Sequence, residues 1–278
     1  MKKWLALVLV LALSLSLCAC GGGGSSSGGG KNAIVGEWKS LEGTVVKFNK
    51  DGTGDVGGTE FTWKYDGELK TYTIAVGIAV TAAVKTENDL RFVETVNARY
   101  YHPDDHAKAY QAAMQDAKDE IAGYTDGRTK IEMGKSYAFA PGVTIKFTDV
   151  SFEEYLFNTD KTGIHVCLEA EFTADGSAAA ERIPSLKYKT HVLHDDIKTY
   201  WSSSTHSWGN GKDRGEKEIK PGTTVTSKVE IYSDTSADYP NEPSLKTNTS
   251  MMISCFSLNG VDYYIDISEY VVAYSNNK

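Results

Sequence analysis

Basic residues, proline and histidine are scarce in this chain of 278 residues. It has 29 Lys and Arg against 37 Asp and Glu, a net charge of −8, whereas a nucleic-acid-binding protein needs a basic surface. The 6 Pro and 26 Gly fit a β-rich fold with many turns. Hydrophobic residues make up 41% and charged residues 24%, which excludes wholesale disorder. The length predicts two domains.

The N-terminal apolar run is too short for a comfortable transmembrane helix, which needs about 20 residues. It extends from Trp4 to Leu17 and is preceded by Lys2 and Lys3. A positive segment followed by a short apolar segment is typical of a signal peptide.

The residues LCACG at positions 17–21 resemble the lipobox of bacterial lipoproteins. The resemblance implies cleavage before Cys20 and attachment of lipid to its sulfur, hence an extracytoplasmic protein anchored to the cell membrane. An ordinary secretory signal cut elsewhere and an uncleaved anchor are the alternatives. With residues 1–19 as the signal peptide, 27 basic and 37 acidic residues remain, a net charge of −10.

Residues 20–32 comprise the lipidated cysteine and a tether. Positions 21–30 read GGGGSSSGGG, a composition that behaves as a flexible coil. Ten such residues span about 16–19 Å on average, so the tether lifts the first folded residue off the membrane.

Residues 33–102 predict an antiparallel β-meander of about six short strands, with turn signals such as Asn49–Gly52 and Glu87–Asp89. Gly36-Glu37-Trp38, followed by a Lys-Asp-Gly-Thr hairpin and a Thr-Trp-Lys-Tyr strand, resembles the small lipocalin-like modules of bacterial lipoproteins. The resemblance implies a small or partial barrel with Trp38 plugging one end. Eight strands around a ligand cavity normally need about twice this length, so a large cavity is not expected.

Residues 103–126 predict a connecting α-helix, because Pro103 and the two acidic residues after it suit a helix N-terminus. An apolar stripe at alternating spacings of three and four follows: Ala107, Tyr110, Met114, Ala117, Ile121 and Tyr124. The stripe fits a connector that lies on its own domains. A partner helix or short coiled coil is the alternative, although fewer than three heptads are present.

Residues 127–278 predict seven or eight strands, the pattern of an immunoglobulin-like β-sandwich. Residues 164–172 alternate cleanly, and Asn259-Gly260 is a strong hairpin signal. Met133-Gly134-Lys135, that alternating strand, and Lys220–Thr224 before another long strand resemble the telokin-like immunoglobulin-fold modules of Gram-positive surface lipoproteins. The resemblance implies a surface-displayed binding or spacer module, not an enzyme.

Two cysteines, Cys167 and Cys255, remain for the folded domains, and both lie on expected strands. Export would permit a disulfide between them. Cys167 lies on the polar face of its strand, which disfavours a bond across the sandwich core. A bond between neighbouring strands stays open.

A long Ser- and Gly-rich loop from Tyr200 to Glu216 is the candidate binding site. It carries four ring-bearing side chains: Tyr200, Trp201, His206 and Trp208. Loops of this length are often functional, and exposed aromatic rings stack on sugars or anchor a protein partner. The competing interpretation is that one Trp packs into the sandwich while the rest is solvated.

Catalytic and metal-binding motifs are weak. His102 and His106 stand four residues apart, a spacing that can hold a metal, but no third ligand is evident. No Ser-His-Asp or Cys-His arrangement follows from a local motif. We therefore expect no enzyme, no metal and no cofactor; a hydrolase assembled from distant residues is the least favoured hypothesis.

Two functional hypotheses follow. The first is a lipid-anchored, non-enzymatic protein that binds an envelope protein or a polysaccharide through its β-sandwich loops. The alternative is a carrier that holds a small apolar ligand in the lipocalin-like module. A filled interior in the first domain, with an aromatic patch around Trp201 and Trp208, would favour the first hypothesis. An apolar void there would favour the second.

Overall fold

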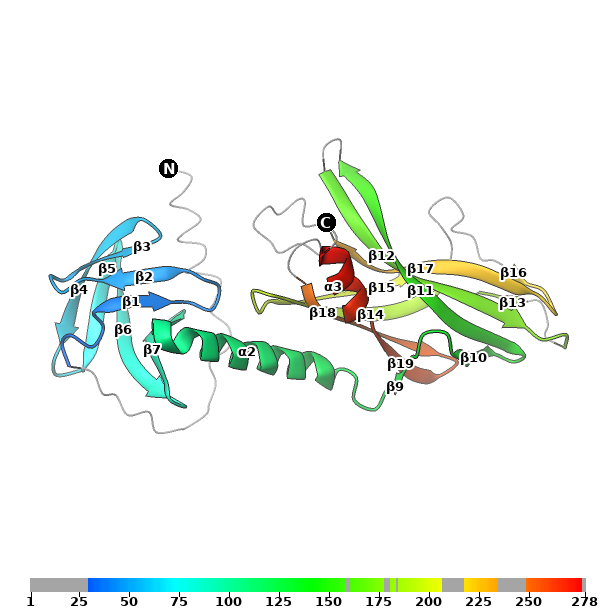
Figure 1. Cartoon of the computed structure of the whole chain (residues 1–278), viewed down its shortest axis with the longest axis horizontal. Coiled ribbons are helices and arrows are strands. Elements are labelled where there is room, and N and C mark those ends of the chain that lie inside the picture. Colours follow the sequence, from blue (N-terminus) through cyan, green and yellow to red (C-terminus); the bar gives the residue numbers. More distant parts are fainter. Residues whose placement is uncertain are drawn as a thin grey trace. The chain divides into compact units, whose positions relative to one another are not determined.

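The computed structural model describes residues 30–158, 161–177, 181–183, 185–206, 218–234 and 249–276. These residues are mainly β, and the chain divides into two compact units, the first ending at Ala113 and the second beginning at Met114. Figure 1 shows an antiparallel barrel in blue and cyan, a long helix, and the sheets of the second unit. The predicted fold class is confirmed: an N-terminal antiparallel barrel, a helix and a β-sandwich.

The first unit is a closed barrel of eight strands, in which each strand pairs antiparallel with the next and β8 returns to β1. The strands are β1 (Gly36–Lys39), β2 (Val45–Phe48), β3 (Thr53–Val56), β4 (Thr59–Asp66), β5 (Thr71–Val76), β6 (Ile78–Glu87), β7 (Leu90–Thr95) and β8 (Arg99–Tyr101). The sequence predicts about six strands and misses β3 and β8. Glycine and aspartate disfavour strand structure in β3, and β8 is only 3 residues long.

Aromatic side chains pack together inside the barrel, because alternate residues of its strands point inward. The Phe48 ring lies 5.2 Å from Phe61 and 6.3 Å from Trp63, and Trp63 lies 5.8 Å from Tyr72. Trp38 is buried beside them, and its Nε1 donates a hydrogen bond to the carbonyl of Ile34 at 2.8 Å. The barrel core is therefore built largely from edge-on aromatic contacts, which are favourable ring geometries.

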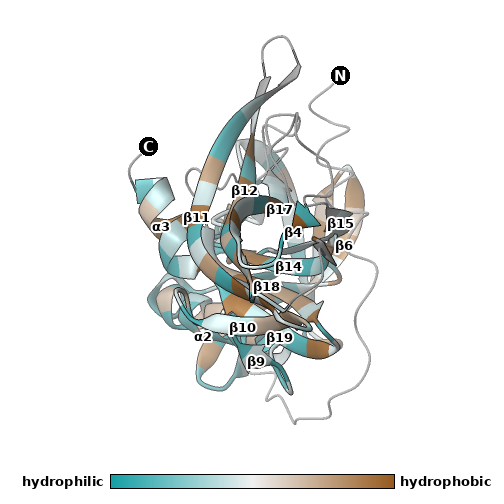
Figure 2. Ribbon diagram, turned by 90° about the vertical axis from the view of Figure 1, so that its right-hand side faces the viewer, coloured by the Kyte–Doolittle hydropathy of each residue, from teal (hydrophilic) through white to brown (hydrophobic). Residues whose placement is uncertain are grey.

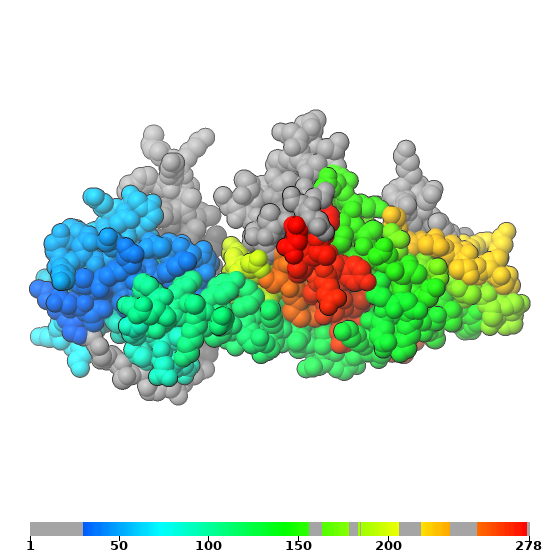
Figure 3. All heavy atoms as spheres, in the orientation of Figure 1, coloured from blue at the N-terminus to red at the C-terminus, as the bar shows by residue number. Residues whose placement is uncertain are grey.

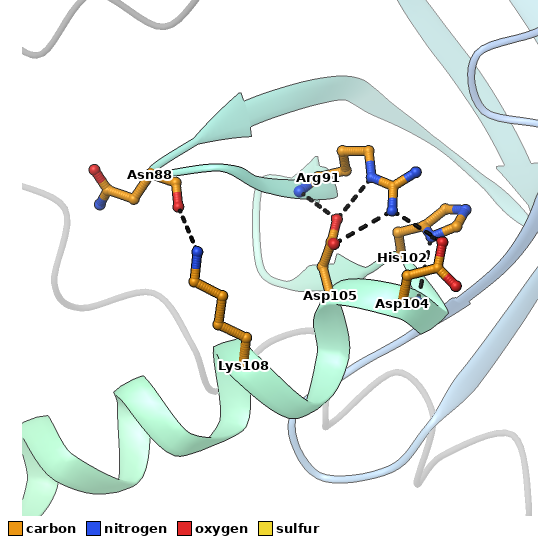
Figure 4. A network of polar contacts seen from close by, with 6 residues as sticks. All are labelled: Asn88, Arg91, His102, Asp104, Asp105 and Lys108. Atoms are coloured by element: carbon orange, nitrogen blue, oxygen red, sulfur yellow. Dashed lines mark hydrogen bonds and ion pairs between the residues drawn. The ribbon is translucent and has the colours of Figure 1, made fainter.

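Helix α2 (Pro103–Gly123) begins directly after the barrel, as the sequence predicts. Its start is held by an ion-pair network that joins the first turn to β7 (Figure 4). Asp105 accepts hydrogen bonds from the backbone N–H of Arg91 at 3.0 Å and from its Nε at 2.7 Å. The predicted apolar stripe is wrong at Ala107, which is exposed. Ala109, which the stripe does not include, is buried.

The second unit contains a four-stranded sheet in the order β10-β11-β12-β17 and a five-stranded sheet in the order β15-β14-β18-β19-β9. A separate pair is formed by β13 and β16. The strands are β9 (Thr129–Lys130), β10 (Ser136–Ala140), β11 (Val143–Asn158), β12 (Lys161–Ala174), β13 (Glu181–Arg182), β14 (Leu186–His194), β15 (Thr199–His206), β16 (Glu218–Ile219), β17 (Thr224–Asp234), β18 (Thr249–Leu258) and β19 (Val261–Asp266). The predicted hairpin at Asn259-Gly260 joins β18 to β19.

One hydrophobic core lies between the two large sheets. Alternate residues of β12, such as Val166 and Leu168, share a buried cluster with Tyr188 and Phe256 of the opposite sheet. Figure 2 shows the corresponding alternation of hydrophilic and hydrophobic bands along β11. This two-sheet packing is the β-sandwich that the period-2 patterns predict.

Helix α3 (Ser268–Asn276) ends the described chain, where the sequence analysis expects only β structure. Its N-terminus is capped by Asp266, whose Oδ1 accepts a hydrogen bond from the backbone N–H of Ser268 at 3.0 Å. The Tyr274 ring stacks on Phe152 of β11 at 4.3 Å, and Val271 is buried. Figure 3 shows α3, in red, packed directly against the green surface of the sandwich.

Within the described ranges, no helix combines the length and the apolar character that a bilayer crossing requires.

Candidate functional site

The second half of α2 covers part of the five-stranded sheet, on the side that faces away from the sandwich core. We call this side the outer face. Ala117 and Ile121 of the helix form a buried cluster there with Leu193, Ile253 and Cys255 of the sheet. The second half of the apolar stripe of α2 therefore packs on its own chain, as the connector interpretation predicts.

The turn after α2 places Tyr124 against a row of side chains on the outer face. The Tyr124 ring stacks on His191 of β14, with 3.7 Å between centroids and 16° between planes. The Lys189 Nζ lies 5.2 Å from the Tyr124 ring centroid and 5.1 Å from that of Trp201. Both distances are within the range of cation–π attraction.

Trp201 comes from β15 and projects outward because its neighbour Tyr200 packs inward against the sandwich core. The strand register sets Trp201 directly opposite His191. The Trp201 side chain is 66% exposed, whereas Tyr124 is 40% exposed and His191 is buried. The outer face thus presents a largely exposed indole beside a lysine and a partly covered tyrosine.

The electrostatics of this cluster keep the imidazole uncharged. Burial, together with the positive charges of Lys189 and Arg128, lowers the pKa of His191 to about 4. Arg128 is itself held by its Nε, which donates to the carbonyl of Tyr124 at 3.0 Å, and by Asp262 at 3.7 Å. Burial also raises the pKa of the Cys255 thiol. The imidazole and the thiol beneath this cationic aromatic surface are therefore both uncharged at neutral pH.

The predicted binding residues do not all lie on this surface. Trp201 is on the outer face, whereas Tyr200 is partly buried and its ring meets His194 edge-on at 5.0 Å. His206 is the last residue of β15. The first part of the predicted loop, from Tyr200 to His206, is therefore strand. Trp208 and Cys20 lie outside the described residues. Of the two predicted residues whose side chains the structure describes, Trp201 lies at the candidate site and Tyr200 does not.

The disulfide between Cys167 and Cys255 is not formed in the structure, where both thiols are free and buried. Cys167 belongs to β12 in the four-stranded sheet, and Cys255 to β18 in the five-stranded sheet. The residues that flank Cys167, Val166 and Leu168, face the core, so its thiol points away from the opposite sheet. The alternation of β12 predicts this orientation of Cys167, and the placement of β12 and β18 in different sheets excludes a bond between neighbouring strands.

The histidine pair at the start of α2 is used structurally. The His102 Nδ1 lies 3.3 Å from Asp104, and the His106 Nε2 lies 2.9 Å from the carbonyl of Ser40. Across the described part of the chain, no group of three or more His, Cys, Asp or Glu side chains could hold a metal ion.

Lys189 is not among the binding residues that the sequence predicts, and Tyr124 is predicted only as part of the apolar stripe of the helix. A signal for Lys189 exists in the alternation of β14, because Lys187, Lys189 and His191 share one face of that strand. Nothing in the sequence indicates that the end of α2 reaches the same face.

No known protein family matches the chain, and no curated protein matches it. Among solved structures, the chain is similar to an uncharacterized β-sandwich protein from Clostridium difficile 630, with 11% sequence identity and a TM-score of 0.31. The alignment covers 50% of this chain and 94% of that one.

Proposed function

We propose that this protein is a lipid-anchored, extracytoplasmic, non-enzymatic binding protein that holds a component of the cell envelope on the outer face of its sandwich. The observation that carries the proposal is Trp201, a large aromatic side chain that is 66% exposed and flanked by Lys189 and Tyr124. Exposed aromatic side chains of this kind contribute much of the free energy of many binding interfaces.

The membrane attachment rests on the lipobox-like residues that end at Cys20 and on the Gly/Ser tether after it. The tether reaches the barrel at Gly30, whose carbonyl accepts hydrogen bonds from Ala33 N–H at 2.9 Å and from the Tyr72 hydroxyl at 2.8 Å. Gly30, the first residue that the structure describes, lies ten positions after Cys20, a spacing that suits display close to a membrane surface.

In this proposal the barrel is a lipocalin-like module and the sandwich a telokin-like immunoglobulin-fold module. The buried Trp38 of β1, hydrogen-bonded to the chain before it, supports the lipocalin-like assignment. The aromatic rings that pack inside the barrel support a structural role for it. The carrier hypothesis would need those rings to make room for a ligand.

The binding proposal is tested with the lipid-free chain from residue 21 onward and isolated cell envelopes in a sedimentation assay. We expect Trp201→Ala to weaken binding about tenfold, the loss of roughly 1.4 kcal/mol that one aromatic contact can supply, with little change in Tm. Leu69→Ala removes another exposed apolar side chain, on the barrel, and should bind like the unmodified protein. Equal binding by all three proteins would contradict the proposal.

The lipid attachment is tested by metabolic labelling with an alkyne-tagged fatty acid. Label should be present in the unmodified protein and in Cys18→Ala, and absent from Cys20→Ala, because only the thiol at the cleavage site accepts the lipid. Label that persists in Cys20→Ala would show that this cysteine is not the anchor.

A further inference from the structure

The exposed edge of the outer face carries lysine, hydroxyl and indole side chains. Lys187 and Lys189 of β14 and Trp201, Ser203 and Thr205 of β15 are all exposed. The register pairs Lys189 with Ser203 and Lys187 with Thr205, so the two rows lie side by side. We call these five residues the ribbon face.

The ribbon face is positively charged on a protein whose net charge is −8. Its two lysines lie on the same side of one strand, about 7 Å apart along it. Within the described ranges, neither lysine forms an ion pair with a carboxylate, whereas Lys146 and Lys228 of the opposite sheet both do. Two ammonium groups therefore remain available to an anionic ligand.

Arg128 adds a third positive charge near this surface, although it is shared with Asp262. The buried His191 contributes no charge at neutral pH, because burial and its cationic neighbours lower its pKa to about 4. Lys189 is positioned between the Trp201 and Tyr124 rings, at 5.1 and 5.2 Å from their centroids. The ring and the cation are therefore available to one ligand together.

The side chains of the ribbon face distinguish between classes of ligand. Protein–protein interfaces are enriched in aromatic residues and arginine but depleted in lysine and serine, which are the main residues here. A polysaccharide has the complementary groups: a sugar ring for the indole, hydroxyls for Ser203 and Thr205, and an acidic group for each lysine. Both strands are extended, so successive sugar units can meet successive side chains.

We propose that the ribbon face binds an anionic polysaccharide, in which a sugar ring stacks on Trp201 while carboxylate or phosphate groups pair with Lys187 and Lys189. This inference rests on the proposed function and names the ligand class for the same site. In this arrangement the hydroxyls of Ser203 and Thr205 form hydrogen bonds with the sugar hydroxyls that lie between the charged groups of the polymer.

The test is a titration of the lipid-free chain with four defined polymers. The probes are polygalacturonate for sugar carboxylates, phosphomannan for sugar phosphates, dextran for neutral sugar, and polyphosphate for charge alone. We expect polygalacturonate or phosphomannan to bind at least about tenfold more tightly than dextran and polyphosphate, and binding to weaken as salt rises. Which of the two acidic polymers binds identifies the anion.

Matched variants assign the binding to the ribbon face. Trp201→Ala and the double variant Lys187→Gln/Lys189→Gln should each weaken binding about tenfold, the effect of roughly 1.4 kcal/mol. Trp201→Phe, which keeps a ring, should lose less than Trp201→Ala. The control Lys50→Gln/Lys64→Gln removes the same charge from exposed positions on the barrel and should bind like the unmodified protein.

Three results would overturn the inference, two from the polymer titrations and one from isolated envelopes. Equal affinity for polyphosphate and the acidic polysaccharides would mean charge attraction alone, and equal losses in both double variants would mean that the ribbon face is not the site. Envelopes treated with protease distinguish this failure from failure of the proposed function. If Trp201-dependent binding to envelopes disappears after proteolysis, the proposed function stands with a protein partner, and the polysaccharide inference fails.

Discussion

Gly54 lies where a side chain has no room. A Cβ at this position would stand 2.2 Å from two ring atoms of Phe61 and 2.5 Å from the carbonyl oxygen of Lys47. The cross-strand register pairs Gly54 with Phe61, so the ring lies over the glycine and fills the interior of the barrel beside Phe48. Glycine weakens β3 locally but allows the aromatic core to close.

Replacing Gly54 with Ala should destabilise the barrel by about 1–3 kcal/mol, because the new methyl group must displace a buried ring or the backbone of β2. Gly67→Ala is the matched control, since the nearest atom to its new Cβ is 3.8 Å away. Its effect should stay within about 0.5 kcal/mol. The measurement is chemical unfolding; a Gly54→Ala variant as stable as the control would contradict the packing argument.

His191 is the residue whose charge state the fold controls most strongly on the outer face. Its pKa falls from 6.5 to about 4 because of burial and of the charges on Lys189 and Arg128, while Tyr124 covers its ring. The unfolded chain therefore binds a proton at a higher pH than the folded chain. This contribution to stability is present above pH 6.5 and is lost as the pH falls towards 4.

Lys189→Gln should raise the pKa of His191, since it removes one of the positive charges that lower this pKa. Of the two lysines on β14, Lys189 is the nearer to His191 along the strand. Lys187→Gln, two residues further along, should change the pKa less. An NMR titration of the His191 ring protons measures both shifts. Identical titration curves for the two variants would show that Lys189 does not set the charge of the imidazole.

At the scale of secondary-structure elements, α2 is fixed at its start by charge. Arg91 lies beside the first turn, where Asp104 and Asp105 also meet the positive end of the helix dipole (Figure 4). The hydrogen bonds from Arg91 hold the pKa of Asp105 below its usual value. The resulting stability is present above the pKa of the unfolded carboxyl and is lost as the pH falls through that of the folded one.

Asp105→Asn should lower the Tm by a few degrees at neutral pH, because it removes the charge that Arg91 and the helix N-terminus both favour. The difference from the unmodified protein should shrink as Asp105 becomes protonated in acid. Asp116→Asn changes an exposed aspartate in the middle of the same helix and serves as the control. A loss of Tm that is equal for both variants would rule out a specific role for the first turn.

Strand β18 shows how an element can be buried on both faces. Met252 and Phe256 point into the sandwich core, while Ile253 and Cys255 lie under the second half of α2. The strand therefore contains a continuous run of buried residues. A strand with one solvent-exposed face would instead alternate between buried and exposed residues. Ile253 and Cys255 on its outer side are shielded from solvent because α2 covers them.

At the scale of the whole molecule, the chain has separate hydrophobic cores. The aromatic core of the barrel belongs to the unit that ends at Ala113, and the sandwich core belongs to the unit that begins at Met114. A unit with its own core can unfold as its own cooperative transition.

Calorimetry of the lipid-free chain should show two unfolding transitions. Gly54→Ala should lower the temperature of one and leave the other unchanged, whereas Trp201→Ala should leave both nearly in place because its side chain is largely exposed. A single transition that Gly54→Ala shifts as a whole would mean that the two units unfold together.

The sequence by itself determines much of the architecture. Period-2 alternation, the Asn259-Gly260 turn and the Pro-Asp start of α2 are local signals, and each acts within a few residues of where it is read. They predict the strands of the sandwich, most of those of the barrel, and the helix. Asp266 with Glu269 three residues later is a local capping signal at the start of α3.

Only the tertiary structure decides which surfaces meet. Trp201 is prominent in the sequence, but whether it packs inward or outward depends on the register of β15 against β14, which is a non-local pairing. Tyr124 lies far along the chain from Lys189 and His191, and it joins them because α2 crosses the outer face. The free state of Cys167 and Cys255 follows in the same way from the order of strands in two sheets. Local patterns fix the elements because their causes lie within a few residues; the binding face and the thiol geometry arise from packing between distant segments.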